Sequence, residues 1–144
     1  RVLAWGSEQY GGNTTTVNSI LNSRTFVNIS SNSDTLGAAF VAIDENGLVT
    51  SWGDPVRGGR STTVEVAVRD AGGAKLVFST ATAFTAITKN GSVISWGDAI
   101  SGGDSTTVRS AIDGLTKMIY SNNYAFAALR FDGSVVAWGN AFYG

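Results

Sequence analysis

The sequence predicts a mainly β repeat protein, a single domain of 144 residues assembled from three propeller-type blades. Trp-Gly pairs begin at positions 5, 52, 96 and 138, so their spacings are 47, 44 and 42 residues. A Gly-Gly pair and then a Thr-Thr-Val run follow each of the first three pairs in the same order. Repeats of about 45 residues that contain several short strands are typical of β-propeller blades.

Each repeat is expected to open with a glycine-rich turn and a short helix that starts at Thr-Thr-Val. Val64 and Val68 are four positions apart, so in a helix they share one face. The same spacing recurs at Val17 and Leu21 and at Val108 and Ile112. A helix of about two turns persists only when it packs against its neighbours. Gly72 and Gly114 are expected to end two of these helices.

Three strands are expected after each helix. In the second repeat they are residues 75–79, 83–88 and 92–96, with a turn at Asn90-Gly91 between the last two. An Asn-Gly or Asp-Gly pair between β-rich runs predicts a type I′ hairpin turn, in which both central residues have positive φ. The other repeats carry this signal at Asn46-Gly47 and Asp132-Gly133. Extra residues around 32–37 in the first repeat are expected to form a variable loop.

These signals divide the chain into units at about 7–53, 54–97 and 98–139, with residues 1–6 as the last strand of a preceding unit. Closed propellers generally use about four to eight blades. Three blades are therefore expected to form a partial propeller, or one that is completed by oligomerisation, by further repeats of a longer array or by a larger assembly. Uncovered sheet edges favour such association.

Composition argues against most kinds of chemistry. The chain has no histidine and no cysteine, so it lacks the usual general base, thiolate nucleophiles and the commonest metal ligands. It contains neither a calcium-binding acidic loop nor a glycine-rich phosphate loop, and we expect no catalytic residue, cofactor or metal. The net charge of −1 is not the basic charge that is typical of nucleic-acid-binding proteins, so we expect no nucleic-acid partner. No apolar run is long enough to span a bilayer.

The repeated aromatic residues are predicted to be structural. Identical residues at identical repeat positions suit packing between units, where large aromatic side chains contribute most to a core. These residues are Trp5, Trp52, Trp96 and Trp138, together with Phe40, Phe84 and Phe126. The alternative is stacking against a glycan, which requires the tryptophans to be exposed on each blade.

The four short loops after Trp-Gly vary within this constant frame, and they are the candidate partner-binding residues. Repeat proteins commonly place specificity in such loops. The alternative is that they are merely solvated loop tips. The candidates are Glu8, Gln9, Tyr10, Pro55, Val56, Arg57, Ala99, Ile100, Ser101, Phe142 and Tyr143. The first loop position is Ser7, Asp54, Asp98 or Asn140, side chains that are expected to hydrogen-bond their own turn.

The runs 83–97 and 125–139 resemble the blade signature of the regulator of chromosome condensation superfamily. Propeller-type β-lactamase inhibitors and long Trp-Gly arrays in bacterial and dinoflagellate proteins share this signature. The resemblance covers essentially the whole chain and implies propeller blades of antiparallel strands plus a short helix. The chain departs from the chromatin family where that family has Gly-x-x-His before the hairpin. It also lacks the exchange-factor insertion, so nucleotide-exchange activity is not implied.

Together these features predict a protein–protein interaction or scaffold module without catalytic activity, as an accessory subunit of a larger assembly. The expected partners are other protein chains, including copies of itself, and the assembly can lie at a membrane. The alternatives are a glycan-binding propeller (a lectin or adhesin) and a secreted protein inhibitor. An organelle such as a plastid and the extracellular space both fit the sequence.

Overall fold

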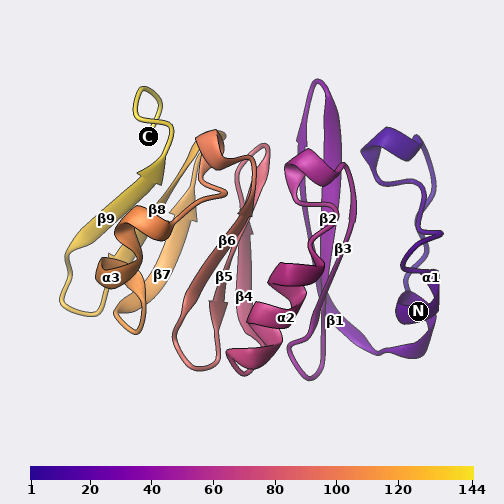
Figure 1. Cartoon of the computed structure of the whole chain (residues 1–144), viewed down its shortest axis with the longest axis horizontal. Coiled ribbons are helices and arrows are strands. Elements are labelled where there is room, and N and C mark those ends of the chain that lie inside the picture. The colour runs from indigo at the N-terminus through magenta and orange to yellow at the C-terminus, as the bar shows by residue number, and fades with distance from the viewer.

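The computed structural model describes residues 1–144 and shows three separate antiparallel sheets that stand side by side (Figure 1). Each sheet has three strands in sequential order, and each lies within one of the predicted repeat units. The strands are β1 (Phe26–Asp34), β2 (Gly37–Asp44), β3 (Val49–Gly53), β4 (Ala74–Ser79), β5 (Ala83–Thr88), β6 (Val93–Gly97), β7 (Thr116–Ser121), β8 (Ala125–Arg130) and β9 (Val135–Gly139). The mainly β, three-blade architecture is therefore confirmed.

Short helical segments connect the sheets. The α-helices are α1 (Asn18–Ser23), α2 (Thr62–Asp70) and α3 (Arg109–Ile112), and the 3-10 turns are η1 (Glu8–Tyr10), η2 (Pro55–Arg57), η3 (Ala99–Ser101) and η4 (Thr106–Val108). One apolar residue of each predicted helical pair is fully buried, namely Leu21, Val68 or Ile112. Such short helices gain their stability from this packing rather than from intrinsic propensity.

A stacked aromatic pair is the common feature of the three blades. The phenylalanine on the second strand of each sheet lies opposite the tryptophan on the third. The ring centroids are 5.4 Å apart for Phe40 and Trp52, 5.6 Å for Phe84 and Trp96, and 5.5 Å for Phe126 and Trp138. All three tryptophans are buried, so they pack in the core and are not exposed for stacking against a glycan.

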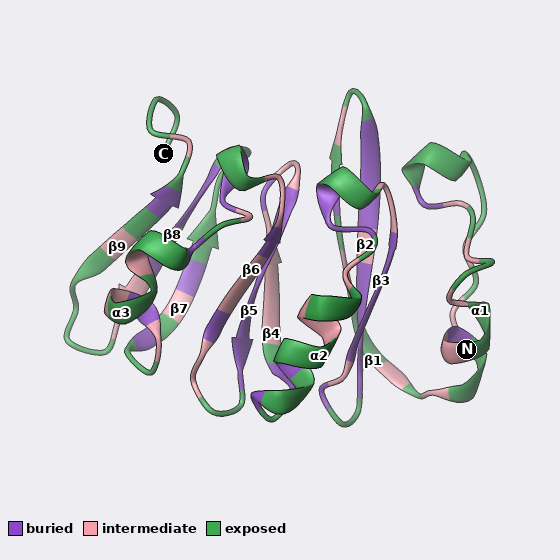
Figure 2. Ribbon diagram, in the orientation of Figure 1, coloured by how far each residue is buried: buried purple, intermediate pink, exposed green.

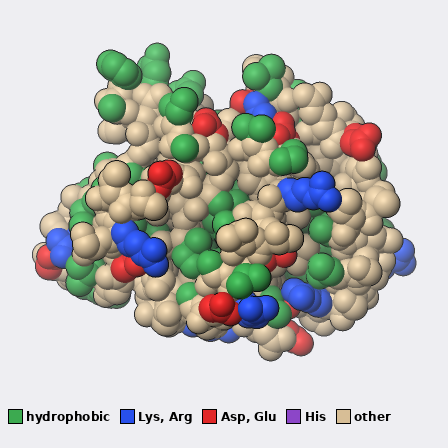
Figure 3. Space-filling model, in the orientation of Figure 1, with side chains coloured by type: hydrophobic (Ala, Val, Ile, Leu, Met, Phe, Trp, Pro, Cys, Tyr) green, Lys and Arg blue, Asp and Glu red, His purple; other side chains and the backbone are tan.

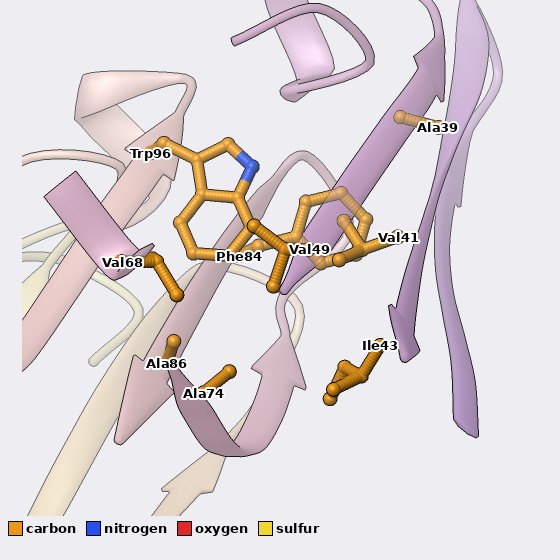
Figure 4. Close-up of a cluster of buried hydrophobic side chains, with 9 residues drawn as sticks. All are labelled: Ala39, Val41, Ile43, Val49, Val68, Ala74, Phe84, Ala86 and Trp96. Atoms are coloured by element: carbon orange, nitrogen blue, oxygen red, sulfur yellow. The ribbon is translucent and has the colours of Figure 1, made fainter. Parts of the chain in front are cut away.

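The core lies between neighbouring blades rather than inside one sheet. Phe84 and Trp96 of the second blade pack against Val41 of the first blade, in a cluster that Val68 of α2 also joins (Figure 4). A second cluster joins the second and third blades in the same way around Phe126. Because each blade completes the core of the next, the blade interfaces hold the fold together.

The hairpin turns differ from the predicted type I′. No residue other than glycine has positive φ, so Asn46, Asn90 and Asp132 are excluded from that geometry. In the first blade, the Gly47 amide donates to the Asp44 carbonyl (2.9 Å) and the Asp44 amide donates to the Leu48 carbonyl (3.0 Å). This is a three-residue loop, a type I turn followed by a left-handed glycine. Only the glycine of each pair requires positive φ.

The extra residues 32–37 do not form a separate loop. They lengthen the β1–β2 hairpin, which rises above the other strands (Figure 1). Strand pairing continues to Asp34 opposite Gly37. The insertion is therefore accommodated as additional ladder, because paired strands satisfy backbone groups that a free loop would leave to water.

The first six residues depart from the prediction. They form no strand, and Trp5 is 85% exposed. The other three tryptophans each have a stacked phenylalanine on a paired strand, and Trp5 has neither. Its structural role, as predicted from its repeat position, is therefore wrong in this structure.

Candidate interaction surface

The variable loops lie along one edge of the molecule. The turns η1, η2 and η3 and the loop at residues 140–143 all stand at the upper edge in Figure 1, and the β2–β3, β5–β6 and β8–β9 hairpin turns lie at the opposite edge. Two equivalent hydrogen bonds join the first strands of neighbouring blades, β1 to β4 and β4 to β7. The Ser79 hydroxyl donates to the Ser31 carbonyl (2.9 Å), and the Ser121 hydroxyl donates to the Ser79 carbonyl (2.7 Å). The turns are thus presented in a fixed order.

The first residue of each loop shapes its turn. The amide of Val56 donates to Asp54 Oδ1 (2.8 Å), and the amide of Ile100 donates to Asp98 Oδ1 (3.2 Å). The amide of Phe142 donates to Asn140 Oδ1 (2.9 Å) in the same way. The predicted self-capping of these turns is confirmed at three of the four loops; Ser7 makes no such bond. A turn capped in this way holds its third residue in one orientation.

A second anchor holds each turn from the blade side. The Asn32 side-chain amide donates to the Arg57 carbonyl (2.9 Å), and the Thr80 hydroxyl donates to the Ser101 carbonyl (3.0 Å). The same two side chains also accept hydrogen bonds from backbone amides of the second strand that follows. Asn32 Oδ1 accepts from the Ala39 amide, and Thr80 Oγ1 accepts from the Ala83 amide. Asn122 repeats the arrangement in the third blade, with Tyr143 as acceptor (2.7 Å). Sequence reasoning missed these anchors, because the insertion displaces Asn32 from the position that Thr80 and Asn122 share.

With both ends of the turn fixed, the third loop residue projects into solvent. Val56 is 66% exposed, Ile100 is 68% exposed and Phe142 is 93% exposed. Their neighbours Pro55, Ala99 and Ala141 are exposed as well. The turns are exposed, whereas the middle strands β2 and β5 are largely buried (Figure 2). Hydrophobic side chains project along the upper edge (Figure 3). We call Val56, Ile100 and Phe142 the turn-tip row.

Arg57 is not available to a partner, and its prediction as a binding residue is corrected here. Its side chain is 9% exposed. Nε and Nη2 donate to the two carboxylate oxygens of Asp34 (both 2.8 Å), and Nη1 donates to Asp54 Oδ2 (2.6 Å). These bonds lower the pKa of Asp34 and raise that of Arg57. The guanidinium therefore fastens η2 to the lengthened β1–β2 hairpin.

The remaining candidates divide between the surface and the interior. Gln9 and Tyr10 are exposed, but both donate to backbone carbonyls at the hairpin tip, Leu36 and Thr35. Ser101 is buried and donates to Asp98, so its prediction as a binding residue is also corrected. Tyr143 is exposed beside Tyr124, with ring centroids 4.9 Å apart. Glu8 is exposed and accepts from Asn13.

A shallow groove separates the first two turns. Its volume is about 300 Å³, and Glu8, Gln9, Gly53, Asp54 and Pro55 line it. Two of these residues are acidic and none is basic. Asp54 is already paired with Arg57, so Glu8 is the carboxylate of the groove that faces a positively charged side chain beside the exposed Val56.

Features of other functional classes are few. No group of three or more acidic residues is arranged to hold a metal ion. None of the helices is both long enough and apolar enough to cross a membrane. The strongest chemical feature of this edge is thus a row of exposed apolar tips among carboxylates.

Comparison with known proteins supports the fold. No protein-family model matches the chain, and no curated protein sequence matches it. Among solved structures, the crystal structure of human WBSCR16 is similar, with a TM-score of 0.53 and 20% sequence identity. The match covers 83% of this chain and 35% of that chain, so this chain spans about a third of its length. The likeness is one of fold and agrees with the mainly β, three-blade architecture described above.

Proposed function

We propose that this protein is a non-catalytic interaction module that serves as an accessory subunit of a larger assembly. The observation that supports this role most directly is the turn-tip row. Three successive blades use the same side-chain cap to expose an apolar residue at the same loop position. A solvated loop tip needs neither an apolar side chain nor a doubly anchored turn.

The blade frame supports the same proposal. Its repeated aromatic residues are used in the core, and its only buried cation is held by two carboxylates. Variation is concentrated in the turns, where a scaffold can change its partner without changing its core. The likeness to human WBSCR16 is compatible with such a module.

Quantitative affinity purification from the native cells tests the proposal. The tagged chain is expected to recover a foreign protein in near-stoichiometric amount, under conditions where an unrelated tagged protein does not. A variant with the buried core residue Phe126 replaced by aspartate provides the unfolded control. Recovery of only identical copies, or of nothing above background, would contradict an accessory role.

A further inference from the structure

We infer that the turn-tip row binds a basic polypeptide segment that also carries apolar side chains. This inference rests on the proposed interaction role and specifies the chemistry of the partner. It combines two independent properties of the same edge, the exposed apolar tips and the surrounding charge.

The apolar contribution comes from paired residues at equivalent positions. The exposed pairs are Pro55-Val56, Ala99-Ile100 and Ala141-Phe142. Single exposed apolar residues are ordinary on protein surfaces, whereas recurrence along one edge marks an interaction site. The side-chain caps hold the backbone of each tip before a partner arrives, so binding loses little conformational freedom in the turns.

The charge at this edge is negative. Carboxylates of Glu8, Asp34, Asp54 and Asp98 belong to the turns and the hairpin that supports them. The Arg57 guanidinium is already shared by two of these groups, and Arg60 is the other basic residue beside the turns. The acidic groove of about 300 Å³ lies next to Val56. These four carboxylates outnumber the two guanidiniums, so complementary charge favours lysine or arginine in the partner.

A polypeptide fits this edge better than a membrane does. Apolar tips could also enter a lipid surface, but anionic leaflets attract lysine and arginine, and the two arginines beside the turns are the paired Arg57 and Arg60. Negative charge at the turns would instead repel such a leaflet. A basic segment with apolar side chains satisfies both properties together.

Fluorescence anisotropy with a defined probe tests the inference. The probe is a labelled 18-residue peptide of leucine and lysine with the leucines on one helical face; the comparison peptide has glutamate in place of lysine. The wild-type chain is expected to bind the lysine peptide at least about tenfold more tightly than the glutamate peptide. The double substitution V56S/I100S is expected to raise the Kd for the lysine peptide about tenfold. Glu8→Gln is expected to raise it about threefold, and this difference should disappear at high salt.

The matched control is V27S/V66S, which removes two exposed valines away from the turns and should change the Kd less than twofold. Circular dichroism verifies that both double variants fold. Equal binding of the two peptides, no binding of either, or wild-type affinity in V56S/I100S would overturn the inference. So would tighter binding to phosphatidylserine vesicles than to the peptide. If V56S/I100S still recovers its partner from cells, the proposed accessory role stands and this inference alone fails.

Discussion

Replacing Arg57 with methionine tests whether this side chain is a structural clamp. The Arg57 side chain is 9% exposed and makes three charge-assisted hydrogen bonds to Asp34 and Asp54. Removal of one partner from a buried ion pair costs about 3–5 kcal/mol. The Asp34 and Asp54 side chains remain 26% and 15% exposed, so water compensates in part. We therefore expect R57M to lower the free energy of unfolding by about 2–3 kcal/mol, using this range with a discount for solvent.

Urea denaturation followed by circular dichroism measures this change. The corresponding fall in melting temperature is about 6–12 °C, at about 3–4 °C per kcal/mol for a domain of this size. Arg60→Met is the matched control, because Arg60 is exposed and forms no ion pair. A cycle with D34N should give a coupling energy above about 1 kcal/mol. If R57M and R60M lose the same stability, the clamp interpretation is wrong.

The same clamp gives a signed pH dependence. The pKa of Asp34 in the folded protein lies below its ordinary value of 3.8, chiefly because Arg57 donates hydrogen bonds to it. A lowered folded-state pKa adds stability above the unfolded-state pKa, and this stability is lost as the pH falls through the folded-state pKa. The wild type should therefore lose more unfolding free energy than R57M as the pH is lowered from 5 through 3. Parallel pH profiles for the two proteins would contradict the assignment.

Two further predictions concern the blade interfaces, and urea denaturation measures both. Trp138 Nε1 donates to the Gly102 carbonyl (3.1 Å), whereas the Trp96 Nε1 has no partner, so W138F should cost about 1 kcal/mol more than W96F. Equal losses would argue that this hydrogen bond adds nothing. At Gly58, φ is +88° and an added Cβ would lie 2.8 Å from Trp96 Cδ1, so G58A should cost about 3 kcal/mol or more. Gly114 has φ +69° but open space around it, so the control G114A should cost only about 1–2 kcal/mol; similar losses would contradict a packing role for Gly58.

The repeat architecture could be predicted because each unit carries the same local sequence signals. Trp, Phe, the helical pair and the turn glycine recur at equivalent positions, so three copies supported every assignment. The turn type could not be settled in this way. Asn-Gly is compatible with both a two-residue and a three-residue loop, and the pairing of Ile43 with Val49 selects the longer one.

The roles of the charged residues in the turns were harder to predict than the repeat architecture. The sequence places Arg57 in a variable loop, which favours a recognition role, but its partner Asp34 belongs to the insertion and has no equivalent in the other units. Comparison between repeats cannot reveal a contact that occurs once. The apolar tips were predictable from the loop position, whereas their exposure depends on anchors such as Thr80 that lie outside the loop.

The arrangement separates recognition from stability at the level of single loop positions. Position one of the loop supplies the side-chain cap, and position four supplies the carbonyl that the blade anchors. In the three capped loops position three is Val56, Ile100 or Phe142, whose side chains make neither contact; Gln9, at the same position of the first loop, donates to the Leu36 carbonyl. Because these three turns do not depend on the chemistry of position three, that side chain can vary without loss of the turn. The negative groove between the first two turns adds charge selectivity beside it. In the interaction role proposed above, the turns select the partner, while the tryptophan–phenylalanine pairs beneath them remain the same from blade to blade.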